Sequence, residues 1–569
     1  MTLNRRSVAL LTAVAMTVAG CAAGASGNLD TVPETPTTTV GRQTTVAGQT
    51  PTSTLPQVST DPVYGGTLRY GIEADSLTPW TPQGTAAAVS GHMVMRSVYD
   101  TLALPTRDLE VEGNLLASIT PNSDWTVWTL ETRPGIEFHD GSSLTGAVVA
   151  DNLQRHRRSF VTGPFLTNVA DISQDDMTVT VTMRQPWVTF PSVLTTQVGY
   201  VASSTWLAAV DTDPSLALTP VGTGPFVFDS YEPGGTFRAV RNDSYWREGL
   251  PYLDAVEFTP LRNIRDRSQA LLDNRVDIIH TSNGDEIARF RERIGEFSMV
   301  EAAEFGETTY IMLNAGNPTS PVSDSRVRSA MAMALDYELI KQGRNGGIFD
   351  VANGPFSPGM IGYLDDTGFP TYDPDGARAL VDAWEADNGP LSITFTTTSD
   401  EFNRISAELY AQFWEEVGID VTVQTIDQSL YIGYALTGNF EAYFWRLHSG
   451  FDPDLQNVWW NSLNAIDYGT VTVNFSRLRD PVIDEALAVI RTSADDAARR
   501  TAAEDVNRRF ADQAYNLWLG WAITGIISQP DVRDVNTGFA TPAGSPVLPT
   551  GVGIGGSHQL AQIWLEPGS

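Results

Sequence analysis

Basic residues are scarce in this chain of 569 residues. It contains 36 lysine and arginine residues against 68 aspartate and glutamate residues, which gives a formal net charge of −32 at pH 7. The only lysine is Lys341. Such a surface repels phosphate groups, because nucleic-acid binding depends on cationic side chains that neutralise the backbone. We therefore exclude nucleic acid as a partner, and contact of the folded surface with anionic lipid headgroups is disfavoured for the same reason.

Cysteine is equally rare. Cys21 is the only one, so no disulfide can form within the chain. It follows two arginines, an apolar run over residues 8–18 and the small residues of a Val-Ala-Gly-Cys sequence. This is the layout of an export signal, and it matches the bacterial lipobox, in which the cysteine is lipidated. We expect residues 1–20 to be a lipoprotein signal peptide and Cys21 the lipidation site; the alternative is a signal peptide with an incidental cysteine.

Long apolar runs and aromatic residues are missing from the segment that follows. Residues 21–61 are rich in Thr, Pro, Ser, Gly and Gln, a composition that cannot bury enough surface to fold and that predicts a flexible tether. No later segment approaches the roughly twenty apolar residues needed to span a bilayer. We therefore expect a protein anchored to the extracytoplasmic face of the membrane through lipid, and not inserted into it.

Histidine shows no metal-ligand spacing. The six histidines stand far apart, at positions 92, 139, 156, 280, 448 and 558, whereas protein metal sites usually draw ligands from closely spaced positions. We predict no metal site and no cofactor. His139 and Asp140 have no nucleophile beside them, and the tryptophans and carboxylates, which would suit a glycosidase, form no recognisable pair of catalytic acids. The chain is therefore not expected to be an enzyme.

Three motifs follow one another between residues 221 and 258. They are Gly222-Thr223-Gly224-Pro225-Phe226, Arg241-Asn242-Asp243-Ser244-Tyr245-Trp246 and Pro251-Tyr252-Leu253-Asp254. Glycine at positions 222 and 224 allows positive φ, and Pro225 fixes the exit of the chain. A phosphate loop does not fit, because the Lys-Ser/Thr ending is missing and no helix opens there. We predict two strands joined by a Pro-Gly-Gly turn at 233–235, then a loop and a third strand.

The order and spacing of these motifs resemble the family-5 extracellular solute-binding proteins of ABC transporters, the dipeptide/oligopeptide-binding family. Further segments are similar to the same family: GGTL at 65–68, YDTL at 99–102, RPGIEFHDG at 133–141 and RVRSA…ALD at 326–336, in a predicted helix over 325–340. The resemblance implies an α/β, periplasmic-binding-protein-like two-lobe fold. The fold would be of type II and would belong to the large cluster of such proteins, which has an extra subdomain. It would enclose its ligand in a hinged cleft.

The resemblance also implies a division of the chain after the signal peptide and tether. Lobe I would take its core from residues 62–90, 215–305 and 525–569. Residues 91–214 would form an extra subdomain of lobe I, and residues 306–524 would form lobe II.

The first candidate ligand residues lie where strands end, because α/β folds bind ligands there. Trp80 follows the first predicted strand, and the alternative for it is a packed loop anchor. Thr397, Asn403 and Arg404 lie between a strand and the start of a helix and are expected to face the cleft. His280 ends another strand and is interpreted as a hydrogen-bonded core residue.

A second group of candidates lies between residues 440 and 460. The family pattern here is W-x-x-D-x-x-D-P, and its first aspartate receives the α-ammonium group of a peptide. Trp445 and Asp452-Pro453 match, but the position of that aspartate falls near His448 or Ser449. The departure weakens the case for a free amino terminus and leaves Asp452 and Asp454 as alternative anions. Apolar walls are expected from Trp445 and Trp459, and polar contacts from Arg446, His448, Asp452 and Arg404.

These observations predict a lipid-anchored solute-binding component of an ABC importer. It would capture peptides or a similar small solute by hinge closure, as a monomer in the periplasmic or equivalent space, and deliver it to a permease and its ATPase. One alternative keeps the fold and binds a non-peptide ligand, such as a metal chelate, haem or oligosaccharide. The other is a surface adhesin or signalling lipoprotein.

Overall fold

The computed structural model describes residues 61–75, 80–302, 305, 307–344, 346–447, 450–548 and 557–567. The expected signal peptide, Cys21 and the tether up to residue 60 lie outside the described residues, as does His448. Within the described ranges, no helix has both the length and the apolar character that a membrane span requires.

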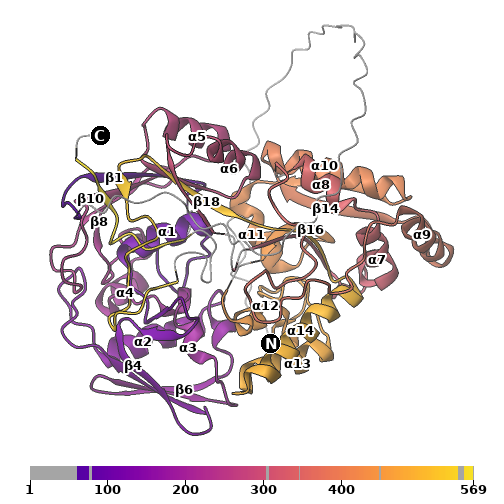
Figure 1. Ribbon diagram of the computed structural model, residues 1–569. Helices are drawn as coiled ribbons and strands as arrows, with labels where there is room; N and C mark the ends of the chain where they lie inside the picture. Colours follow the sequence, from indigo (N-terminus) through magenta and orange to yellow (C-terminus); the bar gives the residue numbers. More distant parts are fainter. Residues whose placement is uncertain are drawn as a thin grey trace, which may run out of the picture. The chain divides into compact units, whose positions relative to one another are not determined.

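The largest sheet has seven strands in the order β12-β18-β11-β1-β10-β9-β8 (Figure 1). These strands are β1 (Thr67–Ile72), β8 (Phe226–Ser230), β9 (Phe237–Arg241), β10 (Ala255–Pro260), β11 (Ile278–Thr281), β12 (Ser298–Ala302) and β18 (Thr524–Ser528). β1 runs parallel to β10 and β11, whereas β18 lies antiparallel between β11 and β12. The three strands predicted after the Gly-Thr-Gly-Pro motif are confirmed as β8, β9 and β10.

The glycines of that motif have a different role from the one predicted. Neither Gly222 nor Gly224 has positive φ. Both instead pack against the end of helix α1 (Val89–Val98), where the Gly224 amide donates to the Val98 carbonyl over 2.8 Å. A Cβ at Gly222 would lie 2.0 Å from that carbonyl oxygen. The loop therefore needs glycine because two backbones meet there.

A second sheet has five strands in the order β15-β14-β16-β13-β17. Its strands are β13 (Thr308–Leu313), β14 (Ser392–Thr398), β15 (Asp420–Ile426), β16 (Ala442–Leu447) and β17 (Asn516–Trp521). One face packs on helices α7 (Ser325–Met333), α9 (Pro374–Asn388) and α10 (Glu401–Glu416) through a shared apolar cluster. The helix predicted over 325–340 is wrong as a single element: Asp336 is extended and accepts from the Leu339 amide, and so starts a separate helix, α8 (Tyr337–Gly343).

A four-stranded antiparallel sheet has the order β4-β5-β7-β6. It consists of β4 (Leu116–Pro121), β5 (Val127–Thr132), β6 (Val169–Asp175) and β7 (Thr178–Met183), with helix α2 (Gly146–Arg158) in contact with β6 and β7. Each of the three sheets takes its strands, to within one residue, from one part of the division set out above. The division itself stays a proposal.

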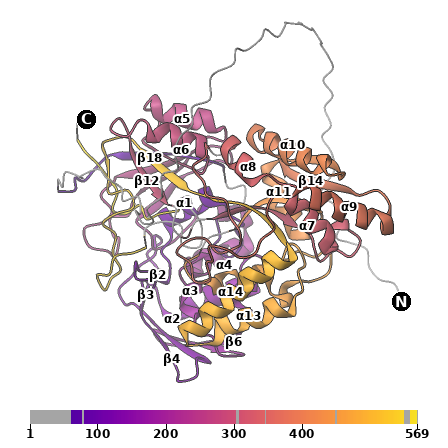
Figure 2. The same ribbon diagram turned by 45° about the vertical axis from the view of Figure 1, so that its right-hand side comes forward.

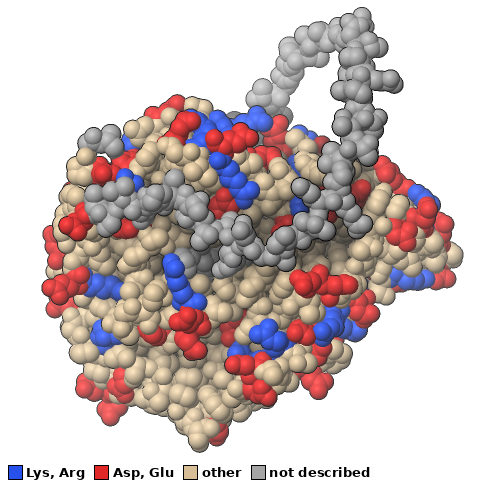
Figure 3. Space-filling model, in the orientation of Figure 1, with Lys and Arg blue, Asp and Glu red and all other residues tan. Residues whose placement is uncertain are grey.

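Two long helices, α13 (Pro481–Thr492) and α14 (Asp496–Gln513), lie side by side near the end of the chain (Figure 2). The aspartates before them, Asp480 and Asp495, accept from backbone amides of the first turn and so fix where each helix begins. The charged side chains on the visible face are mixed, with arginines among the carboxylates (Figure 3).

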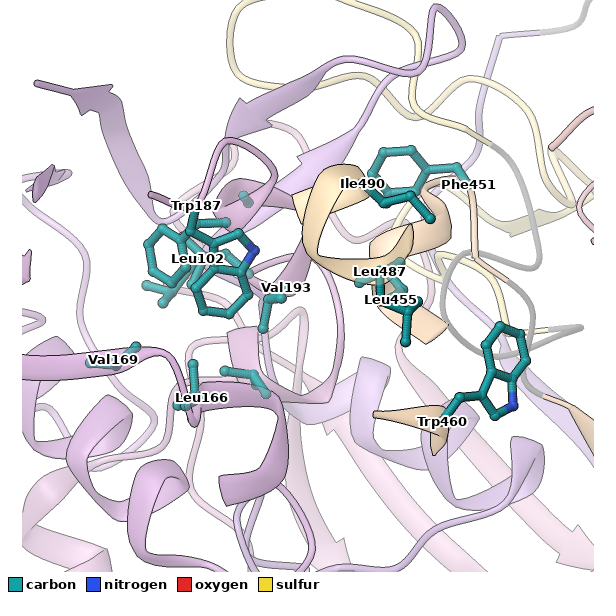
Figure 4. Packing of buried hydrophobic residues seen from close by; sticks show 14 of the residues in the cluster. Leu102, Leu166, Val169, Trp187, Val193, Phe451, Leu455, Trp460, Leu487 and Ile490 are labelled. Atoms are coloured by element: carbon teal, nitrogen blue, oxygen red, sulfur yellow. The ribbon is translucent and has the colours of Figure 1, made fainter. Parts of the chain in front are cut away.

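One apolar cluster joins the four-stranded part to this helix pair. Trp187 and Val193 belong to it, and so do Leu487 and Ile490 of α13 (Figure 4). All four side chains are 3% exposed or less. The burial of these side chains holds α13 against a part of the chain that lies some 300 residues earlier.

Candidate functional site

Two of the predicted tryptophans line one aromatic pocket. Trp445 lies opposite Tyr310 in the pairing of β16 with β13, and its ring is 5.1 Å from that of Phe475. Trp459 lies 5.5 Å from the same Phe475 ring. The free volume of the pocket is only about 20 Å³, room for about one water molecule. Its rings contact one another, so a larger ligand would need them to move apart.

Arg446, the next residue on β16, connects the two larger sheets. Its Nε forms an ion pair with Glu307 Oε2 at 3.2 Å, and its Nη1 donates to Ser282 Oγ. Ser282 follows β11 of the seven-stranded sheet, and Glu307 precedes β13 of the five-stranded sheet. The Arg446 side chain is 31% exposed, whereas that of Glu307 is 4% exposed. One guanidinium group is thus held by the ends of strands from both sheets.

A second carboxylate, Glu73, lies directly after β1. Arg267 of helix α5 (Ile264–Leu272) places Nη2 3.3 Å from Glu73 Oε1. Burial raises the pKa of Glu73, but the attraction of Arg267 and Arg446 outweighs it, and the net pKa lies below its ordinary value. For Arg446, burial lowers the pKa, and Glu307 and Glu73 outweigh it in the opposite direction. Two carboxylates, Glu73 and Glu307, thus lie beside two guanidinium groups, Arg267 and Arg446, and the opposite charges balance one another.

His280 lies beside this cluster. Its side chain is 2% exposed, and neither ring nitrogen has a hydrogen-bond partner among the described residues, so its interpretation as a hydrogen-bonded core residue is wrong. Its Nε2 is 4.0 Å from Glu73 Oε2. Burial lowers its pKa to about 4, an effect larger than the attraction of Glu73. The ring is a neutral imidazole near pH 7.

The two candidate aspartates are already neutralised by arginines. Asp452 is 8% exposed and pairs with Arg499 Nη2 at 2.5 Å. Asp454 is 3% exposed and accepts from Arg491 Nε at 2.9 Å and from Trp187 Nε1 at 2.7 Å. A buried carboxylate is stable only when it is paired in this way. Both side chains therefore stabilise the fold in this structure, and neither presents a free anion to a ligand.

The remaining candidates lie in three different environments. Trp80 is 1% exposed and packs edge-on against Phe237 at 5.2 Å, which is the place of a packed loop anchor. Thr397 is 1% exposed on β14. Asn403 donates to Asp400, the residue that caps α10, and Arg404 pairs with Glu408 on the exposed side of that helix. Because β14 pairs with β16, Thr397 lies one strand away from Trp445 and Arg446. The contacts named for Trp80, Asn403 and Arg404 lie elsewhere, and contact of any of these four residues with a ligand stays a prediction.

The sequence reasoning missed Glu73, Ser282 and Glu307 as site residues. A local signal was present for two of them, because Glu73 follows β1 directly and Ser282 follows β11, and strand ends are where α/β sheets bind ligands. Glu307 carries no such signal. It becomes recognisable only through its ion pair with Arg446, which is distant in the chain.

Comparison with known proteins agrees with this fold. The family described as bacterial extracellular solute-binding proteins, family 5 Middle, matches residues 110–469. The glutathione-binding protein GsiB of Pectobacterium atrosepticum is 26% identical over 369 residues, which is 63% of this chain and 69% of that protein.

Solved structures of similar fold include two proteins with bound ligands. One is the PBP AgaA from A. tumefacien R10 in complex with agropinic acid, with a TM-score of 0.77, 22% identity and coverage of 89% of this chain and 99% of that one. The other is the periplasmic binding protein DppA from Helicobacter pylori in complex with the peptide STSA, with a TM-score of 0.77, 20% identity and the same coverage. The predicted α/β, two-lobe periplasmic-binding-protein fold is confirmed by these matches.

Proposed function

Because the chain belongs to the bacterial extracellular solute-binding proteins of family 5, we propose that it captures a small peptide-like solute between its lobes and delivers it to an ABC permease. Its activity is binding, and it is a transport component rather than an enzyme. The alternative of an adhesin or signalling lipoprotein has no observation in its favour.

The position of Arg446 carries this proposal. Its guanidinium group contacts Ser282, which follows β11 of the seven-stranded sheet, and Glu307, which precedes β13 of the five-stranded sheet. In α/β proteins the ends of strands are where ligands bind, and closure of two lobes around a solute brings such ends together. Trp445 lies beside it on β16, so the site combines a cation with an aromatic wall.

The charges around the site favour a ligand recognised through its acceptor groups. Glu73, Glu307, Asp452 and Asp454 each face an arginine, and the position of the ammonium-binding aspartate in the family pattern falls near His448 or Ser449. None of these four carboxylates is left uncompensated to receive an α-ammonium group. Arg446 Nη2, in contrast, forms no hydrogen bond with a described residue, and a guanidinium N–H binds carboxylate or carbonyl oxygens well.

We propose, on this basis, a peptide-like acid or a peptide held by its carboxylate and carbonyl groups. The glutathione-binding relative and the agropinic-acid-bound protein of the same fold support this class. A non-peptide acid of the opine kind is a second candidate, favoured by the agropinic acid complex.

The test is native mass spectrometry of the full-length protein, purified without denaturation, followed by release and identification of the bound solute. Binding of that solute should fall by about tenfold or more in Arg446→Gln, because a charged hydrogen bond is lost. Arg378→Gln, which removes an exposed arginine of α9, is the matched control. Co-purified peptides whose affinity disappears on N-acetylation would contradict the recognition through acceptor groups. Failure to bind any solute would contradict the function itself.

We further propose that the mature protein begins at lipidated Cys21 and is held at the extracytoplasmic face of the membrane. The lipobox sequence supports this. In Cys21→Ala the protein should leave the membrane fraction, and the intact mass should lose the lipid; unchanged membrane association would contradict the anchor.

A further inference from the structure

A second pocket lies in the C-terminal segment that follows β18, drawn in yellow in Figure 1. Its free volume is about 330 Å³, against about 20 Å³ for the aromatic pocket. Small-molecule sites begin at about 300 Å³. The side chains that concern us in its lining are Arg107, Asn536, Phe539, Val547, Leu548 and Gln562.

The walls of this pocket are fixed by contacts with the rest of the chain. Val547 forms a β-bridge with Thr106. Arg247 donates to the Ala540 carbonyl over 2.7 Å, and its guanidinium carbon lies 4.4 Å from the centre of the Phe539 ring. Groups held in this way keep their positions before a ligand arrives, which favours binding.

Two residues of the lining, Gln562 and Asn536, each carry a buried acceptor oxygen that has no partner among the described residues. Gln562 is 4% exposed, and its Nε2 donates to the carbonyls of Asp534 and Gln559, each over 3.2 Å. These two bonds fix the orientation of the amide and leave Gln562 Oε1 buried with no partner in the described part of the chain. Asn536 Oδ1 is likewise buried and has no hydrogen-bond partner in the described part of the chain. A buried acceptor without a hydrogen bond costs about 1–3 kcal/mol, so both oxygens favour a ligand that carries N–H or O–H groups.

The pocket also contains an unpaired cation. Arg107 is exposed, and its guanidinium group forms no ion pair or hydrogen bond with the described ranges; only its backbone amide does, to the Pro546 carbonyl. A guanidinium group with free donors binds carboxylates, often through two parallel hydrogen bonds.

We propose that this pocket is an accessory site for a free α-amino acid with an apolar side chain. The ligand ammonium would donate to Gln562 Oε1 and Asn536 Oδ1, and its carboxylate would pair with Arg107. Phe539, Val547 and Leu548 supply the apolar surface for its side chain. No residue of this site belongs to the site around Arg446, so the proposal stands apart from the proposed transport function.

The experiment is calorimetric titration of the full-length protein with three probes. L-Leucine carries both charged groups, L-leucinamide lacks the carboxylate, and N-acetyl-L-leucine lacks the ammonium. The titrations are repeated in Arg107→Gln, in Thr537→Trp, which fills the pocket from an exposed lining position, and in Arg262→Gln, an exposed arginine outside the pocket. A further variant, Arg446→Gln, alters only the other site.

Leucine should bind the wild-type protein, Arg262→Gln and Arg446→Gln with equal affinity. Its affinity for Arg107→Gln and for Thr537→Trp should be lower by about tenfold or more. The wild-type protein should bind both analogues more weakly than leucine, and Arg107→Gln should no longer distinguish leucine from leucinamide. Absence of leucine binding to the wild-type protein overturns the proposal. Equal binding in all variants, or loss only in Arg446→Gln, overturns it too, because the leucine would then bind elsewhere.

Discussion

Arg446 is the residue on which the charge balance of the site depends. In Arg446→Met the carboxylate of Glu307, 4% exposed, would lose its ion pair with Arg446. Breaking a buried pair in this way typically costs about 3–5 kcal/mol. We expect the free energy of unfolding in urea to fall by an amount in that range, measured by circular dichroism.

The control for that experiment is Arg404→Met. Arg404 and Glu408 pair on the surface of α10, with side chains 44% and 55% exposed. Exposed pairs at this spacing contribute only about 0.3–0.5 kcal/mol. Equal losses in the two variants would mean that Glu307 does not depend on Arg446.

Buried histidines should make the protein less stable in mild acid. Burial lowers the pKa of His156 to about 4, while an unfolded histidine titrates near its ordinary value of about 6.5. The unfolded state therefore binds the proton first, and stability that is fully present above pH 6.5 is lost between 6.5 and 4. In His156→Gln, unfolding near pH 5 should take up about one proton fewer than in the wild-type protein. Urea midpoints measured across this range give the proton uptake, and identical slopes would refute the assignment.

The position of a single residue could be predicted where the local pattern determines it, whereas its contact with a ligand stays a prediction. Trp445 and Trp459 could be assigned to one aromatic wall because the motif around them is continuous in the sequence, and the structure brings them into one pocket. Asp452 could not be judged in the same way. Its partner Arg499 lies 47 residues further along the chain, and nothing in the local sequence shows that the carboxylate is buried.

The Gly-Thr-Gly-Pro loop gives a prediction at the level of elements. In Gly224→Ala the new Cβ would lie 2.6 Å from the Val98 carbonyl oxygen, so the loop and the end of α1 would have to move apart. We expect a loss of about 3 kcal/mol, at the upper end for overpacking. The measurement is the free energy of urea unfolding.

Gly234→Ala is the matched control for this substitution. Gly234 lies in the predicted turn between β8 and β9, with φ of +85° and no atom within 4 Å of a new Cβ. Its cost is conformational only, about 1–2 kcal/mol. A larger loss at Gly234 than at Gly224 would show that the close approach to α1 is not what requires glycine.

Strands and helices could be predicted where residues close to them in the sequence determine where they begin and end. The strands around the Pro-Gly-Gly turn follow from the turn residues. The helix over 325–340 was predicted too long because its apolar spacing continues past Met333. The backbone nevertheless turns extended at Asp336, which caps the next helix, and periodicity alone does not show such a break.

For the molecule as a whole, the charge of −32 predicts that salt stabilises the folded state against urea. Carboxylates outnumber arginines, so the folded chain repels itself, and screening weakens that repulsion. The urea midpoint should rise between low salt and about 0.15 M sodium chloride. Sucrose at equal osmolality separates screening from solute exclusion. A falling midpoint would mean that the ion pairs stabilise the fold more than the net charge destabilises it.

The whole fold was predictable from the order of its motifs, and only partly from physical pattern. Periodicity and turn residues place strands but do not order them in a sheet. The position of β18 between β11 and β12 depends on contacts between residues about 250 apart. The expected return of the chain to the first lobe after about residue 525 came from resemblance; β18 lies in the sheet that contains β1.

The place of β18 has a consequence for the order in which the protein can fold during synthesis. The four-stranded sheet is finished once residue 183 has been made, and the five-stranded sheet after residue 521. The seven-stranded sheet starts first, at β1, yet β12 has no partner in it until residues 524–528 leave the ribosome. The earliest strand therefore belongs to the last of these three sheets to be completed, and an edge of β11, which ends at Thr281, stays open until β18 begins at Thr524.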